Sequence, residues 1–472
     1  MIFSSNIFLF AFLPAVLCIY HVLPAKLKNL FLFLASVFFW FWGTGSVVLV
    51  FLVCFVVNYA AGRLMAGGGR GRAKSCLAAA VTVDLLLLIY FKYFGFLAEQ
   101  AAALLGLFHI TLPRPESVAL PVGISFFTFE AISYVMEVFR GSVSPSRRLS
   151  DFGAYLGLFP HFIAGPIVRY SDVSDRLRSR IVTTDSFFSG VVRFANGLAK
   201  KVLLADSLGT VADKVFRLAD ADLTAPLAWL GIVCYTLQIY YDFSGYSDMA
   251  IGLGKFFGFD FPENFDQPYR AKNITEFWLR WHMTLSSWFR DFLFKPLGAN
   301  RKGDFRTYVN LFLVFLLCGL WHGAAWTFVF WGVYHGSLII VERALRNRYR
   351  FQMSGIPGNI FTFVLIMLGW VLFRSATLGA AGRFLGVMFS LKTAPAGFQF
   401  FPLRYYLQND ILLYLACALL FAWFPVERVR AGMPAEPSLW VAARGAVALV
   451  LMLYSAAVLS TVGFHPFIYF RF

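Results

Sequence analysis

The sequence consists of long apolar runs separated by short polar segments rich in lysine and arginine. About 20 apolar residues in a helix span the hydrocarbon core of a bilayer, and backbone in lipid must satisfy its own hydrogen bonds. Shorter runs favour tilted, interfacial or re-entrant helices. The first run lacks a basic leader, so we interpret it as an uncleaved span. The predicted membrane helices are Ile7–Leu23, Leu30–Trp42, Val47–Ala61, Leu77–Phe96, Phe152–Val168, Phe188–Ala205, Pro226–Phe243, Tyr308–Val341 as a broken pair, Ile360–Phe373, Ile411–Phe424 and Leu439–Val462.

Composition excludes a soluble globular domain. Of the 472 residues, 59% are hydrophobic and 14% are charged, and the mean hydropathy is +0.69. The formal net charge is +16, but the basic residues fall mostly in loops, which favours membrane topology and anionic lipid over a nucleic-acid partner. The six cysteines have no C-x-x-C spacing, so we expect neither a disulfide framework nor a metal site. These observations predict an all-α polytopic membrane protein, a single domain over residues 1–472, with no bound cofactor.

The most distinctive stretch is Cys-Gly-Leu-Trp-His-Gly-Ala-Ala-Trp at residues 318–326. His322 follows Trp321 within apolar sequence, and an ionisable residue at membrane depth marks a functional site by default. Gly319 and Gly323 lie on one helical face and allow another backbone, or a substrate, to come close. The alternative is a buried histidine that hydrogen-bonds a nearby backbone carbonyl.

Basic residues flank this stretch on both sides, and basic loops favour the cytoplasm. If both ends are cytoplasmic, the chain between them must enter the bilayer and return. The apolar block Tyr308–Val341 is shorter than the ~40 residues of two full spans. The sequence therefore predicts a re-entrant or broken pair with His322 near its tip, lining a cavity. The basic loop Arg63–Lys74 is likewise expected on the cytoplasmic side.

Polar residues follow directly on an apolar run at residues 238–248. Asp242 and Asp248 either orient substrate hydroxyls, or pair with arginine or cap a helix. The segment Gly245-Tyr246-Ser247 does not complete a nucleophile elbow, because residue 249 is methionine. A serine-hydrolase mechanism is therefore excluded.

Residues 273–294 are expected to form one amphipathic helix at the membrane interface, capped by Asn273 or Thr275. Arg280 lies off its apolar stripe and His282 adjoins it, so packing and functional roles for this histidine remain equally open. The stripe consists of Trp278, Trp281, Leu285, Trp288 and Phe292.

Two prolines around a glycine predict a helix break at residues 159–167. His161 lies in this break, where a hydrogen bond to backbone is favoured over a position in the same cavity as His322. Glu130 and Glu137 interrupt the weakly apolar stretch Leu120–Glu137, which predicts a short half-span or an interfacial helix.

Five segments together resemble the membrane-bound O-acyltransferase (MBOAT) family, and within it the bacterial alginate O-acetyltransferase type. The resemblance implies an MBOAT-like helical bundle with re-entrant or broken helices around a transmembrane tunnel. It also implies an acyl-CoA donor on the cytoplasmic side and an acceptor on the other side. The segments are Gln238–Asp248, Pro268–Arg270, Phe277–His282, Gly319–Gly323 and Phe467–Phe472.

The family's catalytic histidine falls on His322, and a second polar position of the family falls on His282. A neutral imidazole at His322 can accept the proton of an attacking hydroxyl. His282 is expected to position the acceptor or to polarise the thioester carbonyl as a hydrogen-bond donor. Residues expected to line the tunnel or bind substrate are Trp321, Gly319, Gly323, Asp242, Tyr241, Arg280 and Trp281.

The implied activity is transfer of acetyl groups from acetyl-CoA, across a bacterial inner membrane, for O-acetylation of an exported polysaccharide. Alginate is the first expectation, with cellulose or peptidoglycan as alternatives, and a periplasmic acetyltransferase partner completes the reaction in relatives. Broken helices also suit a transporter, although the sequence shows no paired halves. A structural scaffold would leave His322 unexplained.

Overall fold

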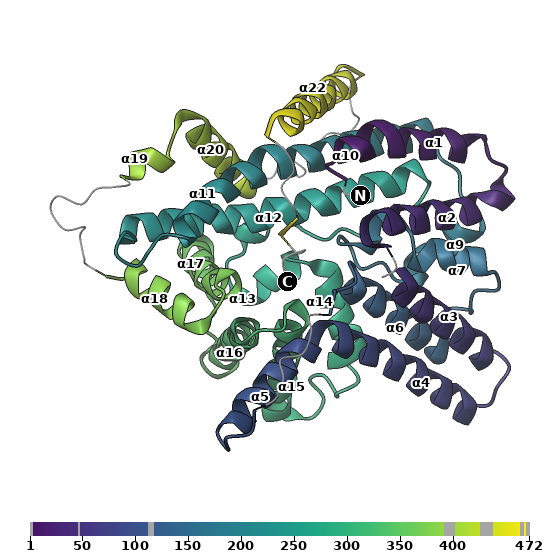
Figure 1. Cartoon of the computed structure of the whole chain (residues 1–472), viewed down its shortest axis with the longest axis horizontal. Coiled ribbons are helices and arrows are strands. Elements are labelled where there is room, and N and C mark those ends of the chain that lie inside the picture. Colours follow the sequence, from purple (N-terminus) through teal and green to yellow (C-terminus); the bar gives the residue numbers. More distant parts are fainter. Residues whose placement is uncertain are drawn as a thin grey trace. The chain divides into compact units, whose positions relative to one another are not determined.

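All regular structure in the described residues is helical (Figure 1), as the composition and periodicity predict. In this part of the chain, seven helices have the length and apolar composition needed to cross a membrane. The expected polytopic membrane protein is thereby confirmed. The computed structural model describes residues 3–45, 48–111, 118–390, 402–424, 438–462 and 467–468. The seven candidate spans are Ala25–Gly43, Val48–Met65, Arg70–Gly106, Gly303–His322, Trp326–Tyr349, Gly355–Arg374 and Ser438–Thr461.

The first of two compact units contains Met1–Phe194 and Met249–Pro262. Its helices α3, α4 and α6 pack against one another, and α2 packs against α7. Its elements are η1 Phe8–Phe12, α1 Leu13–Val22, α2 Ala25–Thr44, α3 Val48–Met65, α4 Arg70–Leu88, η3 Ile89–Tyr93, α5 Phe94–Gly106, α6 Ile124–Arg140, α7 Leu149–Leu156, α8 Phe159–Phe162, α9 Tyr170–Arg178 and the start of α10 Thr184–Ala199.

The second unit contains Ala195–Asp248 and Glu263–Phe472 and includes every predicted site residue. The division into two units does not test the expected single domain over residues 1–472, which therefore stays a prediction. Elements of the second unit are η4 Lys200–Ala205, α11 Asp206–Phe216, most of α12 Ala225–Phe256, η5 Pro268–Arg270, α13 Ile274–Arg280, α14 Met283–Phe289, η6 Arg290–Phe294, α15 Gly303–His322, α16 Trp326–Tyr349, α17 Gly355–Arg374, α18 Leu378–Met388, α19 Leu403–Tyr406, α20 Asn409–Trp423 and α22 Ser438–Val462.

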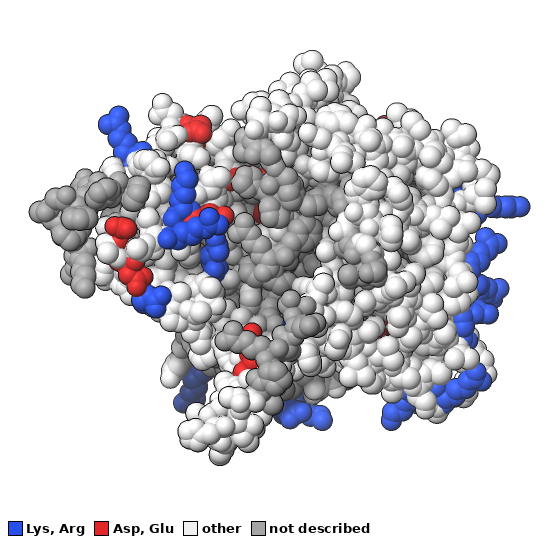
Figure 2. All heavy atoms as spheres, in the orientation of Figure 1, with Lys and Arg blue, Asp and Glu red and all other residues white. Residues whose placement is uncertain are grey.

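The surface fits a protein covered by lipid. The view in Figure 2 is mostly uncharged, with Lys and Arg side chains along its right and lower margins and in a group within its left part. Large apolar side chains such as Phe10, Leu34 and Leu453 are more than half exposed. Exposed apolar surface of this extent is normal only where lipid or another protein covers it.

The region expected to be a re-entrant pair forms two longer helices. The break itself is confirmed, because α15 ends at His322 and α16 begins at Trp326. The expectation that the region is too short for two spans is wrong: the helices have 20 and 24 residues, and each qualifies as a candidate span. Polar turns at the start of α15 and the end of α16 extend both helices beyond the apolar block.

Two other expectations are also corrected. The predicted span Phe152–Val168 is instead the end of α7, the four-residue helix α8 and non-helical backbone, so only the break at its prolines is confirmed. The basic loop is shorter than Arg63–Lys74, because α3 continues to Met65 and α4 begins at Arg70.

His161 has a carboxylate partner in the first unit. Its Nδ1 lies 3.0 Å from Glu130 Oε1, and both side chains are buried. Glu130 Oε1 also accepts a hydrogen bond from the Val168 amide at 3.1 Å. Burial raises the pKa of Glu130, and the neighbouring imidazole opposes that rise. The expected partner of His161 was a backbone group, and a carboxylate takes that place.

A buried ion cluster joins three elements of the second unit. The Lys201 ammonium on η4 lies 2.7 Å from Asp242 Oδ1 on α12 and 2.6 Å from Asp206 Oδ1 on α11. Charges in a low-dielectric interior must be paired to be tolerated. Burial lowers the pKa of Lys201, but the two carboxylates outweigh that effect and the pKa is raised. Lys201 therefore stays protonated and holds the three elements together.

We predict that Lys201→Met destabilises the protein by about 3–5 kcal/mol, because it leaves Asp242 and Asp206 buried without their counter-charge. The control is Lys295→Met, since Lys295 is 62% exposed and its pair with Asp291 should contribute under ~1 kcal/mol. Thermal unfolding in detergent measures the loss of stability in each variant. Equal unfolding midpoints for the two variants would show that the cluster does not stabilise the fold.

The same variant should respond to pH. Burial already raises the pKa of Asp206 to about 7, and the Lys201 ammonium opposes that rise, so losing the ammonium should raise the folded-state pKa of Asp206 further above its unfolded value. The folded state then binds more protons than the unfolded state, so stability increases as pH falls. The unfolding midpoint of Lys201→Met should therefore be higher at pH 5 than at pH 8.

Candidate active site

His322 is the last residue of α15, at the turn to α16. Gly323 continues the chain in extended backbone, and Ala325 precedes the first residue of α16. The imidazole is buried, and its ring centroid lies 5.0 Å from Trp321, 5.0 Å from Trp331 and 5.1 Å from Phe373. Aromatic side chains from α15, α16 and α17 therefore surround this histidine.

Glycines explain how α15 and α16 pack so closely. A Cβ atom on Gly319 would collide with the Phe328 carbonyl oxygen and the Gly332 backbone, and one on Gly332 would lie 2.5 Å from the Phe315 carbonyl oxygen. A Cβ on Gly323 would meet the Phe328 ring. The close approach of another backbone, expected at Gly319, is confirmed. A substrate-lining role for Gly319 and Gly323 stays a prediction.

His282 lies at a second break. The expected single helix over residues 273–294 is wrong: α13 ends at Arg280, α14 begins at Met283, and His282 adopts left-handed backbone with φ 44° and ψ 54°. This conformation is uncommon for a non-glycine residue and requires support from its surroundings. A hydrogen bond of 2.9 Å from the Met283 amide to the Asn264 carbonyl supplies part of that support. The expected cap by Asn273 is confirmed, since its side chain accepts from the Glu276 amide at 2.8 Å.

The His282 ring is buried between aromatic groups and one amide. Its Nδ1 lies 3.1 Å from Asn264 Oδ1, and its Nε2 has no hydrogen-bond partner among the described residues. Its ring centroid lies 4.7 Å from Phe243 and 6.1 Å from Trp321. Burial lowers the pKa of His282, which lies outside the seven candidate spans, to about 3. The imidazole is therefore neutral at physiological pH.

Trp321 connects the two predicted catalytic histidines. Its indole contacts the rings of both His282 and His322. The structure thus brings three of the predicted site residues together, from two helix breaks that are far apart in the sequence. Two imidazole rings against one indole form a site suited to proton transfer in apolar surroundings.

Asp242 and Tyr241 have partners within the protein. Asp242 Oδ2 accepts a hydrogen bond from the Ile468 amide at 2.7 Å, in addition to the ion pair with Lys201. Tyr241 donates its hydroxyl to the Ala418 carbonyl at 2.6 Å. Of the two roles left open for Asp242, pairing is the one observed, with lysine in place of the expected arginine. Substrate roles for both residues stay predictions.

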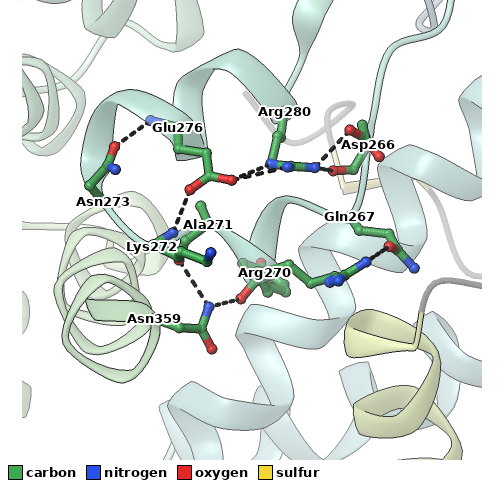
Figure 3. Close-up of polar contacts among 10 residues, drawn as sticks. Asp266, Gln267, Arg270, Ala271, Lys272, Asn273, Glu276, Arg280 and Asn359 are labelled. Carbon is green, nitrogen blue, oxygen red and sulfur yellow. Dashed lines mark hydrogen bonds and ion pairs between the residues drawn. The ribbon is translucent and has the colours of Figure 1, made fainter. Parts of the chain in front are cut away.

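Arg280 and Trp281 likewise face protein partners. Arg280 Nη1 donates to Asp266 Oδ2 at 2.7 Å, and Nη2 lies 3.0 Å from Glu276 Oε1 (Figure 3). Two carboxylates thus neutralise this guanidinium. Trp281 is buried, and its ring centroid lies 4.9 Å from Trp370. Neither residue contacts His322 through an observed interaction, and their substrate roles stay predictions.

Sequence reasoning missed several residues that form the site. Asn264 holds His282, while Trp331 and Phe373 enclose His322. His335 is fully buried, its ring centroid lies 4.8 Å from Trp331, and its ring nitrogens have no hydrogen-bond partner in the described part of the chain. The sequence carried one signal for His335, which is an ionisable residue within an apolar run. No local pattern identifies Asn264, whose partner lies 18 residues away.

No group of three or more His, Cys, Asp and Glu side chains in the described ranges is placed to hold a metal ion. The two site histidines contact aromatic rings, and His282 uses one nitrogen for an amide. The chemistry available to these residues is acid–base and hydrogen-bonding chemistry.

Comparison with known proteins defines the class. The model of the membrane-bound O-acyltransferase family matches residues 34–381, and the chain belongs to this family. A probable alginate O-acetylase of Pseudomonas putida is 42% identical over the full length of both chains. One from Azotobacter vinelandii is 47% identical over 83% of this chain and 78% of its own. A peptidoglycan O-acetyltransferase of Helicobacter pylori is 35% identical over 83% of this chain and 80% of its own.

We predict that Gly319→Ala destabilises the α15–α16 pair by about 1–3 kcal/mol, because the added methyl group overpacks a backbone contact. The control is Gly386→Ala on α18, where no atom lies within 4 Å of the new methyl group. Alanine there should be neutral or stabilise by up to ~1 kcal/mol. Thermal unfolding in detergent compares the two variants, and a Gly319→Ala midpoint at or above wild type would contradict the packing role.

Proposed function

We propose that the protein transfers acetyl groups from cytoplasmic acetyl-CoA to an acceptor on the far side of a bacterial inner membrane, for O-acetylation of alginate. The observation that carries this proposal is His322, a buried histidine at a helix break, enclosed by aromatic rings, in a chain of the O-acyltransferase family.

The reaction assigns His322 the role of general base. Its neutral imidazole accepts the proton of the acceptor hydroxyl as that oxygen attacks the thioester carbonyl carbon. The new C–O bond forms, the C–S bond breaks, and the proton passes to the departing thiolate to give free CoA. Aromatic walls around His322 exclude water, which strengthens polar interactions at the reacting atoms and limits hydrolysis of the thioester.

The choice of alginate rests on the relatives. Probable alginate O-acetylases match this chain at 42% and 47% identity, and the match at 42% covers the whole chain. The peptidoglycan O-acetyltransferase, at 35% identity, supports peptidoglycan as the second candidate acceptor polymer. Cellulose is a third candidate by the family resemblance alone. A periplasmic acetyltransferase partner would complete transfer to the polymer.

The basic termini of the helices support the proposed orientation. Arg306 lies near the start of α15, and Arg346 and Arg348 lie at the end of α16, which supports a position of both ends on one side of the membrane. Basic residues favour the cytoplasm. A cytoplasmic mouth lined by arginine and lysine would also attract an anionic nucleotide donor such as acetyl-CoA.

We predict that His322→Ala lowers acetyl transfer by at least ~100-fold, the lower range for loss of a general base. The protein should still insert and fold. The control is His109→Asn, because His109 is exposed and asparagine tolerates its left-handed φ of 58°. Purified protein in vesicles loaded with labelled acetyl-CoA measures transfer to acceptors outside. Normal polymer acetylation by His322→Ala would contradict the assignment.

The same vesicle assay distinguishes an acyltransferase from a transporter and from a structural scaffold. Release of free CoA inside with acetyl appearing on an outside acceptor identifies an acyltransferase. Movement of intact acetyl-CoA identifies a transporter, and absence of both identifies a scaffold. Alginate, peptidoglycan and cellulose acceptors, each supplied with a periplasmic acetyltransferase, distinguish the polymer.

We predict that the α3–α4 turn and the end of α16 both face the cytoplasm. Single cysteines at Gly68 and Asn347 in a cysteine-free chain should react with an impermeant maleimide only after the membrane is opened. Gly106→Cys is the control, because Arg70–Gly106 is a candidate span and its far end should be labelled from the periplasm. Labelling of Gly68→Cys or Asn347→Cys in intact cells would contradict the proposed orientation.

A further inference from the structure

Asn264 forms a hydrogen-bonded clamp around His282. Its Oδ1 lies 3.1 Å from His282 Nδ1, accepts the Thr284 hydroxyl at 2.9 Å and accepts the Thr284 amide at 3.4 Å. Its Nδ2 donates to Ser247 Oγ at 3.1 Å. Asn264, Thr284 and Ser247 are all buried or nearly so, and they belong to the same unit as the site.

The backbone amide fixes which atom of Asn264 faces His282. A backbone N–H can only donate, so the atom that meets the Thr284 amide must be the oxygen. An amide oxygen can only accept, and the His282 nitrogen beside it must therefore carry a proton. In a neutral imidazole, a proton on Nδ1 leaves Nε2 with a lone pair.

The backbone of His282 supports the same conclusion. Its left-handed conformation is uncommon for histidine, and such outliers persist where the surrounding structure fixes them, often at functional sites. The Asn264 carbonyl holds the next residue through the Met283 amide. Asn264 thus fixes both the backbone and the ring of His282 and leaves its buried Nε2 without a partner among the described residues.

We propose that Asn264 is a positioning residue that holds His282 as its Nδ1–H tautomer, so that Nε2 accepts a hydrogen bond from a substrate O–H or N–H group. This inference rests on the proposed acetyl transfer for the identity of the substrate. It replaces the sequence-based expectation that His282 donates a hydrogen bond to the thioester carbonyl, because Nε2 carries no proton to donate.

The tautomer can be observed without any substrate. The chain has seven histidines, and ¹⁵N-histidine labelling with solid-state NMR separates protonated from unprotonated ring nitrogens. The signals of His282 are those absent from His282→Gln. We expect a protonated Nδ1 and an unprotonated Nε2 at neutral pH. A protonated Nε2 would overturn the proposal, even if acetyl transfer proceeds as proposed.

Variants of Asn264 test the positioning role. Asn264→Leu removes the acceptor and should mix the tautomers while lowering kcat on the order of 10–100-fold, the range for losing the partner that orients a functional histidine. Asn264→Asp keeps an acceptor oxygen and should retain the tautomer and most activity. Thr284→Val is the matched control, because it removes the hydroxyl that donates to Asn264 Oδ1 and leaves the hydrogen bond between Asn264 and His282 in place. A pure Nδ1–H tautomer in folded Asn264→Leu would overturn the role.

Kinetics identify the substrate group that meets Nε2. Both the acceptor hydroxyl and the amide N–H groups of the CoA arm can donate. If the donor arm binds there, His282→Gln should raise KM for acetyl-CoA and slow thioester hydrolysis in the absence of acceptor. If the acceptor hydroxyl binds there, only transfer should slow. Unchanged hydrolysis and transfer would overturn the assignment of Nε2 to substrate.

Discussion

The backbone contact between α15 and α16 determines where His322 lies. Gly319 and Gly332 allow the two helices to approach until a methyl group would collide with the opposite backbone. Small residues serve this purpose in membranes, where association of helices depends on close packing more than on burial of apolar surface. The turn at residues 323–325 follows from that contact, and the turn places His322 between Trp321, Trp331 and Phe373.

The second histidine is placed by hydrogen bonds. Freed backbone groups at a helix break need partners in apolar surroundings, and Asn264 supplies them at the break between α13 and α14. Its side chain also orients the His282 ring. The site thus combines a histidine positioned by packing with one positioned by a polar clamp, and Trp321 contacts both.

The sequence predicted features that depend on local composition. Hydropathy located most spans, and the ionisable side chain of His322 within an apolar run marked the site. Features that depend on distant partners could not be read from it. The break at His282 requires Asn264, 18 residues away, and the apolar stripe of residues 273–294 fits an unbroken helix equally well. The length of α15 was underestimated because its first turn is polar, and polar residues at a helix end are compatible with a span.

The charged residues of the motifs serve the structure and leave the site neutral. Asp242 pairs with Lys201, Asp248 lies 2.6 Å from Lys200, and Arg280 is neutralised by carboxylates. Asp242 also holds Ile468, next to Phe467, whose ring packs 5.8 Å from Phe243. Phe243 in turn packs on His282. The ion pair of Asp242 therefore supports the aromatic side chains that pack on His282, and the His282 ring itself is neutral. An acetyl group is itself uncharged, and a neutral, aromatic-walled site with hydrogen-bonding nitrogens suits its transfer better than fixed charges, which would retain water around them.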